Sequence, residues 1–166
     1  MSALPHGLPA KYADHWRRPW TDQARKSGGF RRWLHAHGYL TPHFTLADAR
    51  CHDGTPIPRS LVAHARDHYF RMEKLRHALG DVPIPVMSGY RTDSYNRQIH
   101  GAKASRHVHA DATDVDKSWV EKVGRQRVQH AAEVIFADGG VGTYPAGSMH
   151  FDSRGYRARW SSFVGW

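Results

Sequence analysis

The feature that most constrains this chain is a short segment dense in potential metal ligands, SRHVHADATDVD at residues 105–116. It supplies His107, His109, Asp111, Asp114 and Asp116. A second pair, His150 and Asp152, lies much further along the chain. A hydrolytic zinc site usually takes three protein ligands from His, Asp or Glu and leaves one position open. A fold that brought the two segments together could complete such a site with His107, Asp114 and His150.

The residues alone leave the ligand set open. In a strand, His107, His109 and Asp111 would point to one face and could bind a metal equally well. A solvated loop can also be rich in His and Asp. The only cysteine, Cys51, rules out an intramolecular disulfide and a cysteine-rich zinc site. We interpret Cys51 as a small buried residue.

The pattern of apolar and turn residues predicts an α+β fold in which helices flank a small antiparallel sheet. With 166 residues, the chain has the length of one ordinary domain. The predicted elements are a helix over 59–79 that stops at Gly80, a strand over 84–87, a strand over 112–116, a helix from 118 to 135, and a hairpin formed by GGVGTY and MHFDSR. Ser118 and Glu121 are predicted to form a capping box at the start of the second helix.

Residues 1–42 are rich in Pro, Gly, Trp and Arg and show only a short helical prospect around Phe30–His37. We predict that they form an N-terminal extension that packs on or flanks the main domain, residues 43–166. Packing is the expected role of their large aromatic side chains, Trp16, Trp20, Phe30 and Trp33.

The charge of the chain favours a polyanionic partner. Its formal net charge is +9 and its sequence pI is near 10.1, which suits nucleic acid, an anionic membrane, a bacterial wall or simply a solvated basic surface. No recognisable nucleic-acid motif is present, and no apolar run reaches membrane-spanning length. The N-terminus does not resemble a secretory signal. We therefore expect a soluble protein made in the cytoplasm, with no nucleic-acid partner and no membrane insertion.

Three segments, SGYRTDSYN, SRHVHADATDVD and HFDSRGYRARW, together resemble the zinc D-alanyl-D-alanine carboxypeptidases and the related phage L-alanyl-D-glutamate endolysins. These belong to a superfamily with the lysostaphin-type peptidases and the hedgehog domain. The family pattern is Ser-x-His, then Asp after several small or variable positions, then a distant His-x-Asp or His-x-His. The matching positions are Ser105, His107, Ala112, Asp114 and His150, and the resemblance runs from about His43 to Trp160.

The resemblance implies a hedgehog or D-Ala-D-Ala-peptidase-like fold and one Zn²⁺ per chain, held by His107, Asp114 and His150. It also implies that Asp116 and Asp152 orient the ligand imidazoles, as carboxylates commonly do. Ala110 stands where the family commonly has Gly, so this backbone position must tolerate a Cβ.

By the same resemblance, Arg91 faces the substrate, where a guanidinium can hold a carboxylate or a developing oxyanion. Ser105 and Tyr90 are candidates for substrate contact, with a scaffold role as the alternative. Many relatives place a general base shortly before the last His ligand, but Gly147 and Ser148 occupy those positions here. Either the base comes from elsewhere, with His109, Asp138 and Asp152 as candidates, or a zinc-bound hydroxide acts with little assistance.

The resemblance therefore implies a zinc peptidase that cuts the stem peptides of bacterial peptidoglycan, and we expect it to act as a monomer. One reaction would be D-Ala-D-Ala carboxypeptidase cleavage. The other would be L-Ala-D-Glu endopeptidase cleavage, which the compact basic chain favours. The alternative of another class is a non-catalytic, zinc-stabilised wall-binding module, suggested by Gly147 and Ser148. Nucleic-acid binding, based on charge and on N-terminal aromatic residues near Arg, is a third interpretation.

Overall fold

The structure, a computed structural model, describes residues 3–161. Two residues of the predicted N-terminal extension and five residues of the predicted main domain therefore lie outside the described part. Its helices are η1 (Ala10–Tyr12), α1 (Ala13–Arg17), α2 (Asp22–Lys26), α3 (Gly28–Ala36), η2 (Arg59–Leu61), α4 (Val62–Ala78), α5 (Asp93–Gln98), η3 (Arg106–His109), α6 (Lys117–Val123) and α7 (Arg125–Ile135). Its strands are β1 (Tyr39–Thr41), β2 (Phe44–Thr45), β3 (Ala112–Val115), β4 (Gly140–Thr143), β5 (Met149–Asp152) and β6 (Ala158–Ser161).

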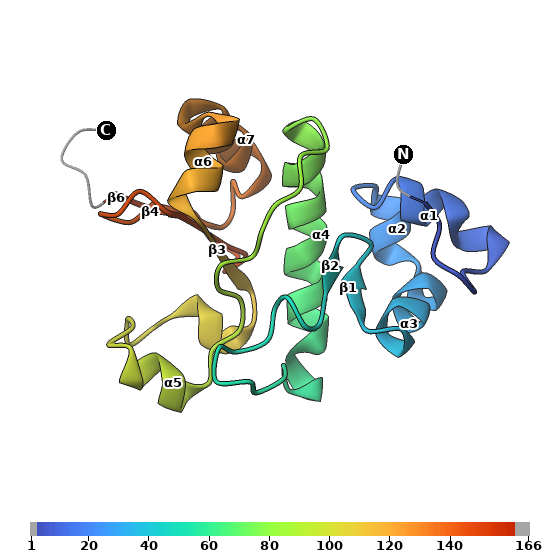
Figure 1. The fold of residues 1–166 in the computed structure, drawn as a ribbon, viewed down its shortest axis with the longest axis horizontal. Helices are drawn as coiled ribbons and strands as arrows, with labels where there is room; N and C mark the ends of the chain where they lie inside the picture. The colour runs from blue at the N-terminus through green and yellow to red at the C-terminus, as the bar shows by residue number, and fades with distance from the viewer. Residues whose placement is uncertain (1–2, 162–166) are drawn as a thin grey trace.

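Helix α4 is the central element of the fold. The N-terminal helices lie on one side of it, and the main sheet with α6 and α7 lies on the other (Figure 1). This arrangement confirms the predicted α+β class with helices flanking a small sheet. No helix among residues 3–161 combines the length and the apolar character needed to cross a bilayer.

The main sheet has the strand order β3-β5-β4-β6. Strand β5 is antiparallel to both β3 and β4, and the β4–β5 pair is the predicted hairpin. Strand β6 was not predicted, and it adds to β4 in parallel orientation. The sheet therefore has three antiparallel strands and one parallel edge strand. Both neighbours of β5, the strands β3 and β4, are held in register with it.

The predicted strand over residues 84–87 is wrong. This segment joins the sheet only through an isolated bridge between Ser88 and Asp114, where the Met87 amide also donates to the Asp114 carbonyl at 2.9 Å. Pro83 and Pro85 have no N–H to donate, so a regular ladder cannot form before Met87.

The predicted helix over 118–135 is two helices, α6 and α7, because Gly124 interrupts it with φ of 101°. Such a backbone angle is accessible to Gly and strained for other residues. The predicted capping box is also wrong. The N-cap of α6 is Asp116, whose carboxylate accepts from the Ser118 amide at 2.8 Å.

The predicted long helix is α4, preceded by the 3-10 turn η2 and followed by Gly80. Its apolar face packs into the main core with residues of the sheet, α6 and α7. Cys51 is buried in this core, as predicted. The core fixes the sheet against α4 and so sets the positions of β3 and β5.

The N-terminal segment contains more helix than predicted. Thr21 and Ser27 cap α2 and α3 by accepting from the amides of Ala24 and Phe30. A second apolar cluster joins this segment to α4, and it consists of Trp16, Ala24, Phe30, Leu34 and Phe70. The aromatic residues Trp16 and Phe30 therefore pack, in line with their expected role.

We expect Phe70→Ala to destabilise the protein by about 3–5 kcal/mol, because it leaves a cavity between α4 and the N-terminal helices. Phe70 is 1% exposed and is the α4 residue of this second cluster. Urea unfolding followed by circular dichroism measures the change. Val134→Ala, at a side chain that is 68% exposed, is the control and should change the free energy by less than about 0.5 kcal/mol. Equal effects of the two variants would contradict the packing described here.

Candidate metal centre

Two neighbouring strands and one 3-10 turn carry the predicted ligands. Asp114 on β3 lies directly opposite His150 on β5 in the antiparallel register, so both side chains leave the same face of the sheet. His107 is in η3, and Ala110 follows in a left-handed conformation with φ of 57° that turns the chain into β3. The family that the sequence resembles commonly has Gly at this position, which adopts a left-handed conformation without strain. Ala110 adopts the same conformation with moderate strain.

The structure brings these three side chains together. The His150 Nδ1–Asp114 Oδ1 distance is 2.8 Å, and His107 Nε2 lies 3.2 Å from Asp114 Oδ1 and 3.3 Å from His150 Nδ1. A tetrahedral zinc with bonds of about 2.0 Å places its ligand atoms about 3.3 Å apart. The three atoms thus fit one face of a zinc tetrahedron, and two imidazoles with one carboxylate are suitable donors for it.

All three side chains are buried, with exposed fractions of 1–3%. Burial lowers the pKa of His107, which favours the neutral imidazole that a metal requires. Burial alone would raise the pKa of Asp114, but the neighbouring His107 and His150 hold that pKa well below its usual range. Burial also opposes the charged form of His150, yet hydrogen bonds to Asp114 and Asp152 raise its pKa overall. The carboxylate is therefore ionised and available to a cation.

The other nitrogen of each imidazole is held by an acceptor. His107 Nδ1 donates to the Gly89 carbonyl at 2.6 Å, and His150 Nε2 donates to Asp152 Oδ2 at 2.9 Å. When the imidazoles are neutral, these bonds hold the remaining proton of each ring away from the shared position, so that His107 presents Nε2 and His150 presents Nδ1 to it.

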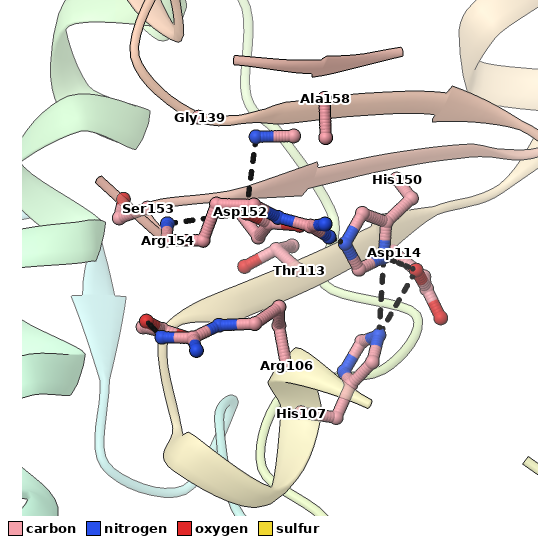
Figure 2. A network of polar contacts seen from close by, with 12 residues as sticks. Arg106, His107, Thr113, Asp114, Gly139, His150, Asp152, Ser153, Arg154 and Ala158 are labelled. Atoms are coloured by element: carbon pink, nitrogen blue, oxygen red, sulfur yellow. Dashed lines mark hydrogen bonds and ion pairs between the residues drawn. The ribbon is translucent and has the colours of Figure 1, made fainter. Parts of the chain in front are cut away.

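Asp152 is held from several sides. It is completely buried, accepts from the Gly140 amide at 3.0 Å and pairs with Arg154, whose Nε donates at 2.8 Å. Figure 2 shows Asp152 beside the His150 ring, with Asp114 and His107 beyond that ring. A Cβ at Gly140 would overlap the Asp152 carboxylate, so only Gly leaves room for it. Asp152 thus acts on the site by positioning His150.

Arg91 contacts the ligand carboxylate. Its Nη2 donates to Asp114 Oδ2 at 2.6 Å and its Nε donates to Ser88 Oγ at 3.0 Å. The Arg91 amide also donates to the His107 carbonyl at 3.1 Å. Arg91 therefore ties the SGYRT loop to two of the three predicted ligands, and among residues 3–161 its Nη1 has no hydrogen-bond acceptor.

Tyr144 is a residue of the site that the sequence did not reveal. It follows β4 in the hairpin, and its hydroxyl lies 3.3 Å from Asp114 Oδ1 and 3.4 Å from His150 Nδ1. Burial and the nearby Asp114 raise its pKa above the usual value. The phenol therefore keeps its proton at neutral pH and can donate a hydrogen bond, but it cannot serve as a base.

Four other residues singled out in the sequence lie around η3 and the preceding loop. Ser105 is buried at the start of η3, and Tyr90 is buried in the main core. His109 is exposed and lies outside the ligand group, and Asp111 pairs with Arg106.

Three further residues singled out in the sequence lie away from the ligand atoms or make other contacts. The prediction that Asp116 orients an imidazole is wrong, because its carboxylate is exposed and caps α6. Asp138 is exposed and paired with Arg71, away from the three ligands. Ser148 is buried, and its carbonyl accepts from the Tyr144 amide, closing the hairpin turn.

We expect Asp152→Asn to weaken zinc binding by about 10- to 100-fold, because a neutral amide holds the His150 tautomer less firmly than a carboxylate does. Competition with a chromophoric chelator measures the zinc dissociation constant. Asp138→Asn is the matched control, since this carboxylate contacts Arg71 and none of the ligands. An unchanged dissociation constant in folded Asp152→Asn would show that Asp152 does not position His150.

His107 on η3 and Asp114 and His150 on adjacent strands form a buried group that suits a zinc ion, with Arg91 and Tyr144 as donors beside it. The Peptidase M15 family model matches residues 42–152, and the chain belongs to this family. The chain is also similar to a zinc D-Ala-D-Ala carboxypeptidase of Streptomyces albus G, at 33% identity over 78 residues. That stretch covers 44% of this chain and 31% of the relative. The family resemblance seen in the sequence is thus confirmed.

Proposed function

We propose that the protein is a zinc peptidase that hydrolyses a peptide bond in the stem peptides of bacterial peptidoglycan. The observation that carries this proposal is the convergence of His107 Nε2, Asp114 Oδ1 and His150 Nδ1 inside the segment that matches a peptidase family. The name of the Streptomyces albus G relative, a zinc D-Ala-D-Ala carboxypeptidase, supports both the metal and the substrate class.

Zinc in this group would supply Lewis-acid chemistry: it would polarise a peptide carbonyl and lower the pKa of the water that attacks this carbonyl. The protein residues would do the rest. Arg91 holds Asp114 in place through Nη2, and its Nη1 is available to a substrate carboxylate or oxyanion. The Tyr144 phenol donates a hydrogen bond to the carbonyl oxygen as negative charge develops on it.

No carboxylate occupies the usual position of a general base. The two carboxylates that contact the ligand imidazoles, Asp114 and Asp152, are engaged by His150, Arg91 and Arg154. Of the three candidates for the base, His109 is the one for which the described residues provide no such partner. It is exposed and lies at the end of η3. We propose that proton transfer relies on His109, so His109→Ala should lower kcat without removing zinc. An unchanged kcat in that variant would assign the proton transfer to solvent.

Two substrates are consistent with this site. Carboxypeptidase cleavage at D-Ala-D-Ala is supported by the relative and by the free Arg91 donor, which suits a terminal carboxylate. Endopeptidase cleavage inside the stem, such as L-Ala-D-Glu, is supported by the net charge of +9, which would hold the protein on an anionic wall.

Digestion of purified peptidoglycan, followed by mass spectrometry of the fragments, tests the proposal. Release of D-Ala alone assigns the carboxypeptidase reaction, whereas release of longer peptides assigns the endopeptidase reaction. Zinc-loaded protein that binds the wall but releases neither product would overturn the proposal and leave a non-catalytic module.

A further inference from the structure

The N-terminal side of α4 carries a concave, strongly basic surface. A cavity of about 500 Å³ is bordered by α2, α3, η2 and α4. Its cationic side chains are Lys26, Arg31, Arg32, Arg59 and Arg66, and the residues that line it include neither Asp nor Glu. The only ion pair described for these five is Arg31 with Asp67 at 3.3 Å. The cavity therefore has a surplus of positive charge.

Arg66 gives this cavity a buried charge without a full set of partners. Its exposed fraction is 7%, and its Nε donates to the Leu40 carbonyl at 3.2 Å. Its Nη2 is buried and has no hydrogen-bond partner in the described part of the chain. Burial, followed by repulsion from Arg31, lowers the pKa of Arg66. A buried guanidinium without a carboxylate partner is costly, and an anion in the adjoining cavity would offset its charge.

A second cavity continues the first. It has a volume of about 460 Å³ and shares His35, Arg59 and Val62 with the basic cavity. Its remaining lining residues are Leu46, Pro56 and Ile57. The two adjoining cavities are together called the basic groove, which is strongly cationic in the first cavity and mainly aliphatic in the second. No Phe, Tyr or Trp lines either cavity.

We propose that the basic groove binds a phosphate ester with a non-aromatic organic part, as found in the polyol-phosphate polymers of a bacterial wall. The guanidinium group of arginine matches phosphate oxygens in geometry and charge. Several converging cations suit a ligand with repeated phosphates better than a ligand with a single carboxylate. The aliphatic end accommodates the carbon skeleton between phosphates. Single-stranded nucleic acid uses aromatic platforms for its bases, which this groove lacks.

The choice of a wall polymer rests on the proposed peptidoglycan function. The cationic cavity is lined by residues of α2, α3, η2 and α4. Helices α2 and α3 lie on one side of α4, and the main sheet that carries Asp114 and His150 lies on the other (Figure 1). A polymer held there would leave the metal centre free. Binding at the groove would therefore raise the local concentration of stem peptides at the centre.

The test measures binding of a fluorescent polyglycerol phosphate to the zinc-loaded chain by anisotropy. Arg32 and Arg59 are both exposed, so the double variant R32E/R59E should fold normally. We expect it to weaken binding by at least about 100-fold, since it replaces two charge-assisted contacts with repulsion. The matched control is R17E/K122E, which makes the same change of charge at exposed residues outside the groove. We expect this control to change binding by less than about fivefold, through the general field alone.

Equal losses in the two double variants would overturn the groove as the site. Equal or tighter binding of a single-stranded oligonucleotide with the same number of phosphates, or of phosphatidylglycerol vesicles, would overturn the wall polymer as the ligand. Cleavage of stem peptides is measured separately on small soluble peptides. Cleavage without polymer binding would remove only this inference, and binding without cleavage would remove only the proposed peptidase function.

Discussion

The variant His107→Ala is expected to lose its zinc and to hydrolyse stem peptides at least about 1,000-fold more slowly, because the metal contributes several kcal/mol of transition-state stabilisation. His107 is 1% exposed, and its Nε2 is within 3.3 Å of both other ligand atoms. Its removal leaves two ligands, which hold zinc much more weakly than three. Plasma mass spectrometry of the dialysed protein should give about one zinc per chain for the parent and close to none for the variant.

The matched control for zinc content is His109→Ala. His109 lies two positions along the same 3-10 turn, but it is exposed and outside the ligand group. This variant should keep about one zinc per chain. Equal zinc loss in the two variants would show that the sequence segment, and not the specific imidazole, determines binding.

Tyr144→Phe is expected to lower kcat by about 100- to 1,000-fold, the usual effect of removing one donor to a developing oxyanion. Because Tyr144 is 3.3 Å or more from the nearest ligand atoms and is not in the ligand group, zinc content and KM should stay close to those of the parent. Steady-state kinetics on a synthetic stem peptide, together with zinc analysis, measures both quantities.

Tyr156→Phe removes the same hydroxyl at a side chain that is 63% exposed, and it should leave kcat unchanged. A Tyr144→Phe variant that lost zinc in proportion to activity would show that the phenol supports the metal centre and does not act on the substrate. Full activity in that variant would remove Tyr144 from the mechanism.

Those parts of the fold that depend on regular periodicity were predictable from the sequence. The apolar spacing before Gly80 predicted α4, and the Pro-Ala-Gly turn between GGVGTY and MHFDSR predicted the β4–β5 hairpin. Helices α1 and α2 have five residues each, too few to show a helical period. Strand β6 is a four-residue edge strand that pairs with β4 in parallel, and so short a segment shows no clear alternation of apolar and polar residues.

The predicted ligands came from the family motif, because residue types alone left His107, His109 and Asp111 equivalent. The structure separates them through backbone direction: η3 buries His107 and leaves His109 exposed. Asp116 was misassigned because β3 ends at Val115, so the carboxylate at the next position caps α6 and does not continue the strand face. Tyr144 was missed because its contact with Asp114 depends on the register of three strands.

The most direct test of the metal centre is a crystal structure of the zinc-loaded protein with an anomalous map at the zinc edge. We expect one strong peak about 2.0–2.2 Å from His107 Nε2, from an Asp114 carboxylate oxygen and from His150 Nδ1. The His150 Nε2 should still donate to Asp152. A peak at another group of residues, or one that His150 binds through Nε2, would contradict the account.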